Sequence, residues 1–460
     1  MLDQNIAREV LARAVSTGGD FAEIFMEDRI DHSILMRSGR IETVNTGRLH
    51  GAGVRVFSGT NAVYVHTNDT SREGLLACAE QAASAVRGGK GCVLVPFKPI
   101  DVSNPGEILL LPTDVKAALK AEKVRAADAA ARRISKEIVQ VNVNYTDHVQ
   151  NVLICNTEGV FVTDRRVRTR LSTSAGASNG TENQTGSDNP GASMGFEIFD
   201  SRIDPDRVGE TAARQAVTML HAPVCPAGVM PVVIDNGFGG VIFHEACGHS
   251  LEATSVQPGM SEFSGKLGQT IAAPCVTAID DGTMQNEWGS ENIDDEGTPT
   301  TRLVLIERGV LKNYMVDRLN GLKMGMAPTG NGRRESYAYA PTSRMRNTYI
   351  APGEDDEEEM LRTMGDGLYA AKMGGGSVNP ATGEFNFAVQ EGYLVRDGKI
   401  ASPVRGASLI GRGGEILMRI DRVGKEMTMG QGMCGSLSGS VPTNVGQPTI
   451  RVSRLTVGGK

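Results

Sequence analysis

The sequence predicts an α+β fold, in which N-terminal units of helix, antiparallel sheet and helix are followed by a β-rich C-terminal domain. Apolar residues at helical spacing begin the chain, alternating runs with turn pairs follow, and glycine concentrates in the C-terminal half. A length of 460 residues, with 22% charged and 40% hydrophobic side chains, suits two or three soluble domains. We place these domains at residues 1–95, 96–222 and 223–460.

The first two units repeat one order of elements. In the first, apolar spacing between Ile6 and Ala14 predicts a helix, strand-like runs follow, and a second helix is predicted from LLACAEQAASAV. A proline-rich linker then leads to an amphipathic helix at 113–134, further strands and a helix capped by Asp204. The intervening stretch 176–193 is rich in glycine, serine and asparagine, which predicts a mobile loop.

The third unit consists of many short strands around one helix. A buried strand is predicted at 230–236, a turn at 237–240 and the helix at 241–252. Later runs predict hairpins, one turning at Asp397-Gly398, and a glycine-rich loop near the C-terminus. The acidic run 354–359 predicts the first turn of a surface helix, because carboxylates there complement the helix dipole, and the alternative is a patch that binds a partner.

Composition excludes several classes of protein. A net charge of −7 and no basic stripe argue against direct nucleic-acid binding. No run of 18 apolar residues occurs, so a membrane span is not expected, and the N-terminus does not resemble a secretory signal. Seven cysteines without a paired spacing fit a reducing compartment. We therefore expect a cytoplasmic protein.

The segment FHEACGHSLE contains His244, Glu245 and His249, a combination typical of metal-dependent hydrolases. The histidines are five residues apart, so a regular helix would rotate one about 140° from the other. A π-type bulge would reduce this angle, and Gly248 would make the distortion cheap. The alternative is that both histidines are hydrogen-bonded core residues without a metal.

A catalytic zinc site needs a third protein ligand and one open position. The sequence offers several candidates, which are Cys434, Glu252, Cys275, Cys225 and His221. Cys434 lies in the predicted glycine-rich loop, where backbone can approach a metal closely, whereas Glu252 could instead orient an imidazole. Glu245 is adjacent to a histidine and could take a proton from water at the metal.

Over essentially its whole length, the chain resembles the TldD/PmbA family of zinc-dependent peptidases, also described as modulators of DNA gyrase. The segments that carry the resemblance are HEACGHSLE, FSGKLGQTIA, DDGTM, NIDDEGTPT, GMAPTGNGRRESYA, the GGG of 374–376 and CGSLSGSVPTNVGQPTIRVSRLTVGG. The resemblance implies one zinc ion held by His244, His249 and Cys434, with Glu245 as the catalytic glutamate. It also implies the metal-containing type of subunit, paired with itself or with a paralogous chain.

The resemblance further implies hydrolysis of unfolded or flexible peptides. We expect an extended substrate that adds a strand to a sheet edge, since backbone contacts tolerate many sequences. Arg333, Arg334 and Tyr337 are candidates for substrate contact or for a dimer interface, and the alternative is that they are surface loop residues. The alternative function is a regulatory subunit that binds a partner and has a structural metal or none. Glu245 favours the peptidase, because a structural site has no use for a base beside its ligand.

Overall fold

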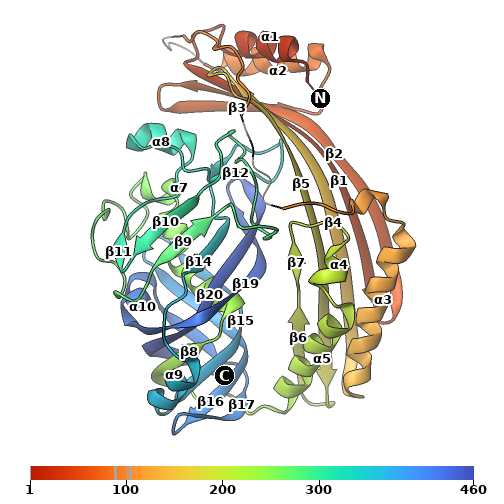
Figure 1. The fold of residues 1–460 in the computed structure, drawn as a ribbon, viewed down its shortest axis with the longest axis vertical. Coiled ribbons are helices and arrows are strands. Elements are labelled where there is room, and N and C mark those ends of the chain that lie inside the picture. Colours follow the sequence, from red (N-terminus) through yellow and green to blue (C-terminus); the bar gives the residue numbers. More distant parts are fainter. Residues whose placement is uncertain (1, 87–90, 101, 103–105, 460) are drawn as a thin grey trace.

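The computed structural model describes residues 2–86, 91–100, 102 and 106–459. Two large sheets face each other, and the long strands of the N-terminal sheet arc around the C-terminal domain (Figure 1). Helices and antiparallel strands mix in the N-terminal half, and strands dominate the C-terminal half. The predicted fold class is confirmed.

The N-terminal sheet has seven strands within the described residues, in the order β3-β2-β1-β4-β5-β6, with β7 paired to β5. Its strands are β1 (Phe21–Arg37), β2 (Arg40–Ser58), β3 (Asn61–Thr67), β4 (Ile138–Asn156), β5 (Phe161–Ser178), β6 (Asn183–Asp188) and β7 (Gly191–Ala192). Both predicted N-terminal units supply strands, and β1 pairs with β4 along most of its length. Residues 1–95 and 96–222 therefore share one layer.

The prediction of a mobile loop at 176–193 is wrong. Gly176 to Ser178 still belong to β5, and β6 returns alongside it, with Asn183 opposite Ser178 and Asp188 opposite Thr173. The strand escaped prediction because its side chains are polar on both faces, so no alternation of apolar residues marks it. Pairing with β5 and packing against α5 (Pro205–His221) stabilise it instead.

Helices cover the outer face of the N-terminal sheet in two groups. At one end α1 (Gln4–Ala14) and α2 (Arg72–Ser84) bury apolar residues against Ile24, Val54 and Leu153. At the other end α3 (Ala117–Ile134) and α5 pack on Val143, Leu171 and their neighbours, and the short α4 (Ile198–Ser201) adds to this core. Two separate apolar cores therefore hold the helices to one sheet.

The C-terminal domain is built on an eleven-stranded sheet within the described part of the chain. Its strands are β8 (Gly228–Ile234), β9 (Ala278–Asp281), β10 (Arg302–Glu307), β11 (Val310–Leu311), β14 (Asn347–Ile350), β15 (Gly367–Asn379), β16 (Glu384–Arg396), β17 (Lys399–Val404), β18 (Ser408–Arg412), β19 (Ile420–Ser436) and β20 (Gly439–Gly458). A small ribbon pairs β12 (Gly332–Arg333) with β13 (Thr342–Ser343). The short helices are α6 (Val241–Phe243), α7 (Ala253–Val256), α8 (Arg318–Met324), α9 (Glu357–Met364) and α10 (Gly413–Arg419).

Two local predictions in this domain are confirmed. The acidic run forms the first turn of α9, where the Asp356 side chain accepts a hydrogen bond from the backbone nitrogen of Glu359. The hairpin of β16 and β17 turns at Asp397 and Gly398, and both have positive φ angles. Separately, none of the described helices is long and apolar enough to cross a membrane.

Charged side chains, rather than apolar ones, make up much of the contact between the two sheets. Glu291 is buried and lies within 4.0 Å of four arginine side chains, which are Arg166 and Arg168 of β5 and Arg333 and Arg346 of the C-terminal domain. The strong positive surroundings hold the pKa of Glu291 well below its usual range despite its burial. This carboxylate therefore links the sheets.

Replacing Glu291 by glutamine should lower the free energy of unfolding by about 3–5 kcal/mol, because the arginines would remain buried without their shared counter-charge. Urea denaturation followed by fluorescence of Trp288, the single tryptophan, measures this. Glu415→Gln is the control, since Glu415 pairs with Arg419 on the surface and its loss should change stability by no more than about 0.5 kcal/mol. Equal urea midpoints for Glu291→Gln and Glu415→Gln would contradict the role of Glu291 as the shared counter-charge of the buried arginines.

Candidate metal centre

The segment FHEACGHSLE forms a helical run of three successive geometries. After β8, a 3-10 turn at Gly237–Gly240 leads into α6, then a π-helical turn at His244–Gly248 and a 3-10 turn at His249–Leu251. The run begins tightly against β20, because a Cβ on Gly240 would lie about 2.5 Å from the carbonyl oxygen of Gly446. The predicted strand, turn and helix are therefore present, and the helix is widened as predicted.

The π-helical turn brings the two imidazoles together. The ring centroids of His244 and His249 are 5.0 Å apart, with an interplanar angle of 79°. Gly248 closes the turn with an ordinary helical φ of −56°, so backbone freedom is not what requires glycine there. A Cβ at Gly248 would lie 2.3 Å from the sulfur of Met345, so the glycine instead provides space.

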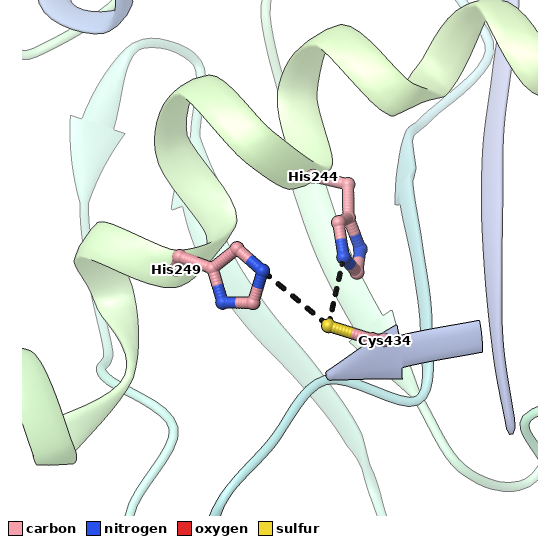
Figure 2. A group of neighbouring side chains, drawn as sticks. All are labelled: His244, His249 and Cys434. Carbon is pink, nitrogen blue, oxygen red and sulfur yellow. Dashed lines mark hydrogen bonds between the residues drawn. The ribbon is translucent and has the colours of Figure 1, made fainter. Parts of the chain in front are cut away.

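Cys434 reaches the imidazoles from the other side of the site (Figure 2). The prediction that it lies in a loop is wrong, because it belongs to β19, opposite Val441 of β20. The glycines around it resemble a loop in sequence, yet they pair regularly with β20. The buried guanidinium of Arg344 donates hydrogen bonds to the carbonyl oxygens of Cys434 and Gly439, which fixes this end of the hairpin.

The sulfur of Cys434 lies 3.3 Å from Nε2 of His244 and 3.3 Å from Nε2 of His249. Burial raises the pKa of this thiol, but the charge of His244 and hydrogen bonds from both imidazoles outweigh it and lower the pKa to about 3. The side chain is therefore a thiolate near neutral pH, which is the form that binds metals.

Glu252 orients His249 and does not join the cluster. One carboxylate oxygen lies 3.0 Å from Nδ1 of His249, and the other accepts a hydrogen bond from the backbone of Met345. Burial lowers the pKa of His249, but the Glu252 carboxylate and Cys434 raise it well above its usual range. This arrangement leaves Nε2 directed at Cys434, as an outer carboxylate does for a metal-binding histidine.

The remaining candidates for a third ligand lie elsewhere. Cys275 is exposed, and its thiol contacts the carbonyl oxygen of Ile420. The thiol of Cys225 contacts the carbonyl oxygen of Pro226. His221 lies at the end of α5, 3.0 Å from Glu137. Among the described residues, only Cys434 thus completes a set of three donor atoms with the histidines.

Glu245 lies beside the cluster without belonging to it. Its carboxylate is 3.8 Å from Nε2 of His249, and 25% of its side chain is exposed, compared with 15% for His249. The carboxylate can therefore meet both the cluster and solvent. This is the position that a general base needs.

The donor set suits a metal ion of zinc type. The three donor atoms lie within 4.8 Å of one another. At a tetrahedral zinc with usual bond lengths, nitrogen and sulfur donors are about 3.6 Å apart. The observed distances of 3.3 Å match this closely. Two imidazoles and a thiolate leave one tetrahedral position free, so the residues fit a catalytic rather than a closed structural site.

A cavity of 770 Å³ follows β19 towards the cluster. Its wall includes residues 428–433, which end directly before Cys434, and Arg170 of β5. Arg170 donates a hydrogen bond to the carbonyl oxygen of Gln431, and the indole of Trp288 donates one to Gly432. Sequence analysis missed both side chains, because Arg170 comes from the N-terminal sheet and Trp288 is far from β19 in the chain.

The side chains of Arg333, Arg334 and Tyr337 lie in the contact between the sheets. Arg333 is 1% exposed and binds the carbonyl oxygen of Met345, and Arg334 is 4% exposed and binds Glu23 of β1. The ring of Tyr337 packs against Gly51 of β2. Both arginines also border a cavity of 240 Å³ that reaches Met433. Substrate contact by these three residues stays a prediction, and their observed role is to join the sheets.

Comparison with known proteins finds metallopeptidase domains and metalloproteases along most of the chain. Residues 22–86, 110–220 and 227–459 match, in order, domain 1, the central domain and the C-terminal domain of the PmbA/TldA metallopeptidases. A metalloprotease TldD homolog of Haemophilus influenzae is 36% identical, covering 96% of this chain and 93% of its own. A metalloprotease of Methanothermobacter thermautotrophicus is 34% identical, covering 94% and 97%.

Solved structures share the whole architecture. A protein of Thermotoga maritima superposes with a TM-score of 0.82 at 24% identity, covering 99% of this chain and 100% of its own. TldE from Thermococcus kodakarensis superposes with a TM-score of 0.79 at 18% identity over 99% and 100%. The fold is thus that of a TldD or TldE chain. The chain belongs to the PmbA/TldD family, as its sequence motifs indicated.

Proposed function

We propose that this protein is a zinc-dependent peptidase that hydrolyses peptide bonds of unfolded or flexible polypeptides. The observation that carries the proposal is the convergence of His244, His249 and Cys434, with the carboxylate of Glu245 beside them. The names of the relatives, metalloproteases in several organisms, support the same class of activity. A regulatory subunit with a structural metal would not need the partly exposed Glu245.

In this proposal, His244, His249 and Cys434 hold the zinc ion, and Glu252 keeps His249 in the orientation required. Zinc supplies Lewis acidity, which polarises a carbonyl oxygen and makes water more acidic. Glu245 takes the proton from the attacking water and then delivers it to the nitrogen of the departing amine. Its partial exposure allows both the water and the scissile bond to approach the same carboxylate.

The proposed substrate is an extended polypeptide that pairs with the open edge of β19. The backbone nitrogen of Asn444 donates to the carbonyl oxygen of Arg346 rather than to β19. Gln431, which lies opposite Asn444, therefore directs its own backbone groups away from β20, and its carbonyl oxygen is already bonded to Arg170. Backbone direction alternates along a strand, so Met433, two residues after Gln431 and directly before Cys434, also directs its backbone groups away from β20. Backbone pairing along this edge would admit many sequences but no folded chain.

Glu245→Gln should retain about one zinc ion per chain and lose activity by roughly 10²–10⁴-fold, because the amide cannot accept the proton. Metal analysis, together with mass spectrometry of peptides released from unfolded casein, measures both quantities. Glu415→Gln is the matched surface control and should cleave like the original protein. Cleavage by Glu245→Gln at the original rate would exclude the proposed mechanism and leave the regulatory alternative.

Cys434→Ser should weaken zinc binding by more than the roughly 10–100-fold loss typical of residues that only orient a ligand. The hydroxyl is a poor substitute for a thiolate at this ion. Competition with a chromogenic chelator gives the affinity. Cys275→Ser serves as the control because its thiol is remote and exposed. Equal affinities for the two variants would move the third ligand to another residue.

We also propose that the chain works as a pair, either with itself or with a paralogous chain. The TldE structure, which has the same fold, is an example of such a paralogue. Native mass spectrometry should give twice the chain mass of 48.8 kDa for the protein alone, or the sum of both masses with the paralogue present. A mass of one chain under both conditions would contradict the pairing.

A further inference from the structure

A second strand edge, that of β6, faces the same cleft as β19. Ser187 shows how this edge is directed, because its backbone nitrogen donates to the side chain of Gln215 and its carbonyl oxygen accepts from Lys372 of β15. Both backbone groups therefore point away from β5. Backbone direction alternates along a strand, so Asn183 and Thr185 direct theirs outward as well.

The outward groups of Asn183 and Thr185 are available to a ligand. Both residues are exposed, and no hydrogen bond from another part of the described chain reaches these groups. They border a cavity of 1120 Å³ that opens between β6 and the C-terminal sheet. In Figure 1, β6 is drawn between β5 and the C-terminal sheet.

The chemistry of this cavity suits a polypeptide backbone rather than a charged ligand. Its two charged lining residues, Glu182 and Arg405, pair with each other at 2.9 Å. The opposite wall consists mainly of small and amide side chains from β16 and β18, with exposed Ile410 among them. An extended chain of mixed sequence meets neither a charge barrier nor a bulky wall there.

The cavity is continuous with the cavity along β19, which extends to Met433, the residue before Cys434. Ser187, Gly375 and Gln390 line both this cavity and the 770 Å³ cavity that follows β19. Lys372 and Gln215 occupy the backbone groups of Ser187, so pairing along β6 must end before that residue. A chain that leaves β6 at this point enters the cavity that extends along β19 to Met433.

We propose that the open edge of β6 at Asn183 and Thr185 is a second polypeptide-binding site, distinct from the metal centre. A long unfolded chain pairs with β6 through its backbone while another part of it lies at β19. The proposal rests on the proposed peptidase function and adds a preference for long chains, because short peptides cannot span both edges. An alternative occupant, a strand of a second copy of this protein, is an outcome of the test.

Thr185→Pro tests the site, because proline removes the outward N–H but leaves the ladder with β5 intact. We expect KM for an unfolded polypeptide of about 30 residues to rise roughly fivefold, as for one net hydrogen bond, and KM for a six-residue peptide to stay unchanged. Thr185→Ala keeps the N–H and should match the original protein with both substrates. Equal effects on the long and short substrates, or none on either, would overturn the proposal.

Hydrogen exchange provides a second measurement, independent of cleavage and of whether Thr185→Pro folds. In Glu245→Gln saturated with the long polypeptide, the Thr185 amide should exchange at least about tenfold more slowly than in the free protein. The six-residue peptide should leave that amide unchanged. Unchanged exchange with the long polypeptide would refute the site, and protection that depends only on protein concentration would assign the edge to a second copy.

The two proposals fail in distinguishable ways. If the original protein cleaves neither substrate, the peptidase function fails, while hydrogen exchange still reports whether β6 binds polypeptide. If it cleaves both substrates and Thr185→Pro does not discriminate between them, only the second site fails.

Discussion

The spacing of two histidines is the constraint on which the candidate site depends. Imidazoles five residues apart diverge on a regular helix, and the π-helical turn from His244 to Gly248 brings their rings to 5.0 Å. The wider turn needs space, which Gly248 provides beside Met345. It also leaves Glu245 partly exposed at the edge of the cluster. The spacing of the histidines, the small Gly248 and the partly exposed Glu245 are therefore all features of the same π-helical turn.

The third donor atom, the sulfur of Cys434, comes from a distant part of the chain, so the site forms only when the C-terminal domain is folded. Cys434 is carried by β19, which β20 holds by pairing and Arg344 fixes by bonding to backbone oxygens. Because Cys434 lies on an edge strand, the residues before it also line the adjoining cleft. In the proposed function, the strand that carries this third donor also positions the extended substrate. Chemistry and substrate binding would then share one rigid element.

The cleft itself depends on how the two sheets are joined. Buried arginines around Glu291 link β5 to the C-terminal domain, and Arg170 and Trp288 bond directly to β19. Such a contact is directional, because each charge must keep its partner to remain buried. An apolar interface would permit sliding, whereas these paired charges specify one relative placement. The N-terminal sheet therefore forms a wall of the cleft as well as a layer of the fold.

The sequence by itself determined the fold class, the widened motif helix and the acidic start of α9, because each depends on neighbouring residues. A resemblance in sequence also pointed to Cys434, although local composition wrongly predicted a loop around it. Only the tertiary structure decided what depends on distant pairing: β6 as a strand, the ion pairs between Glu291 and the arginines of β5, and the single sheet shared by residues 1–95 and 96–222. Polar edge strands and buried ion pairs carry no periodic signal, since their partners lie far away in the chain.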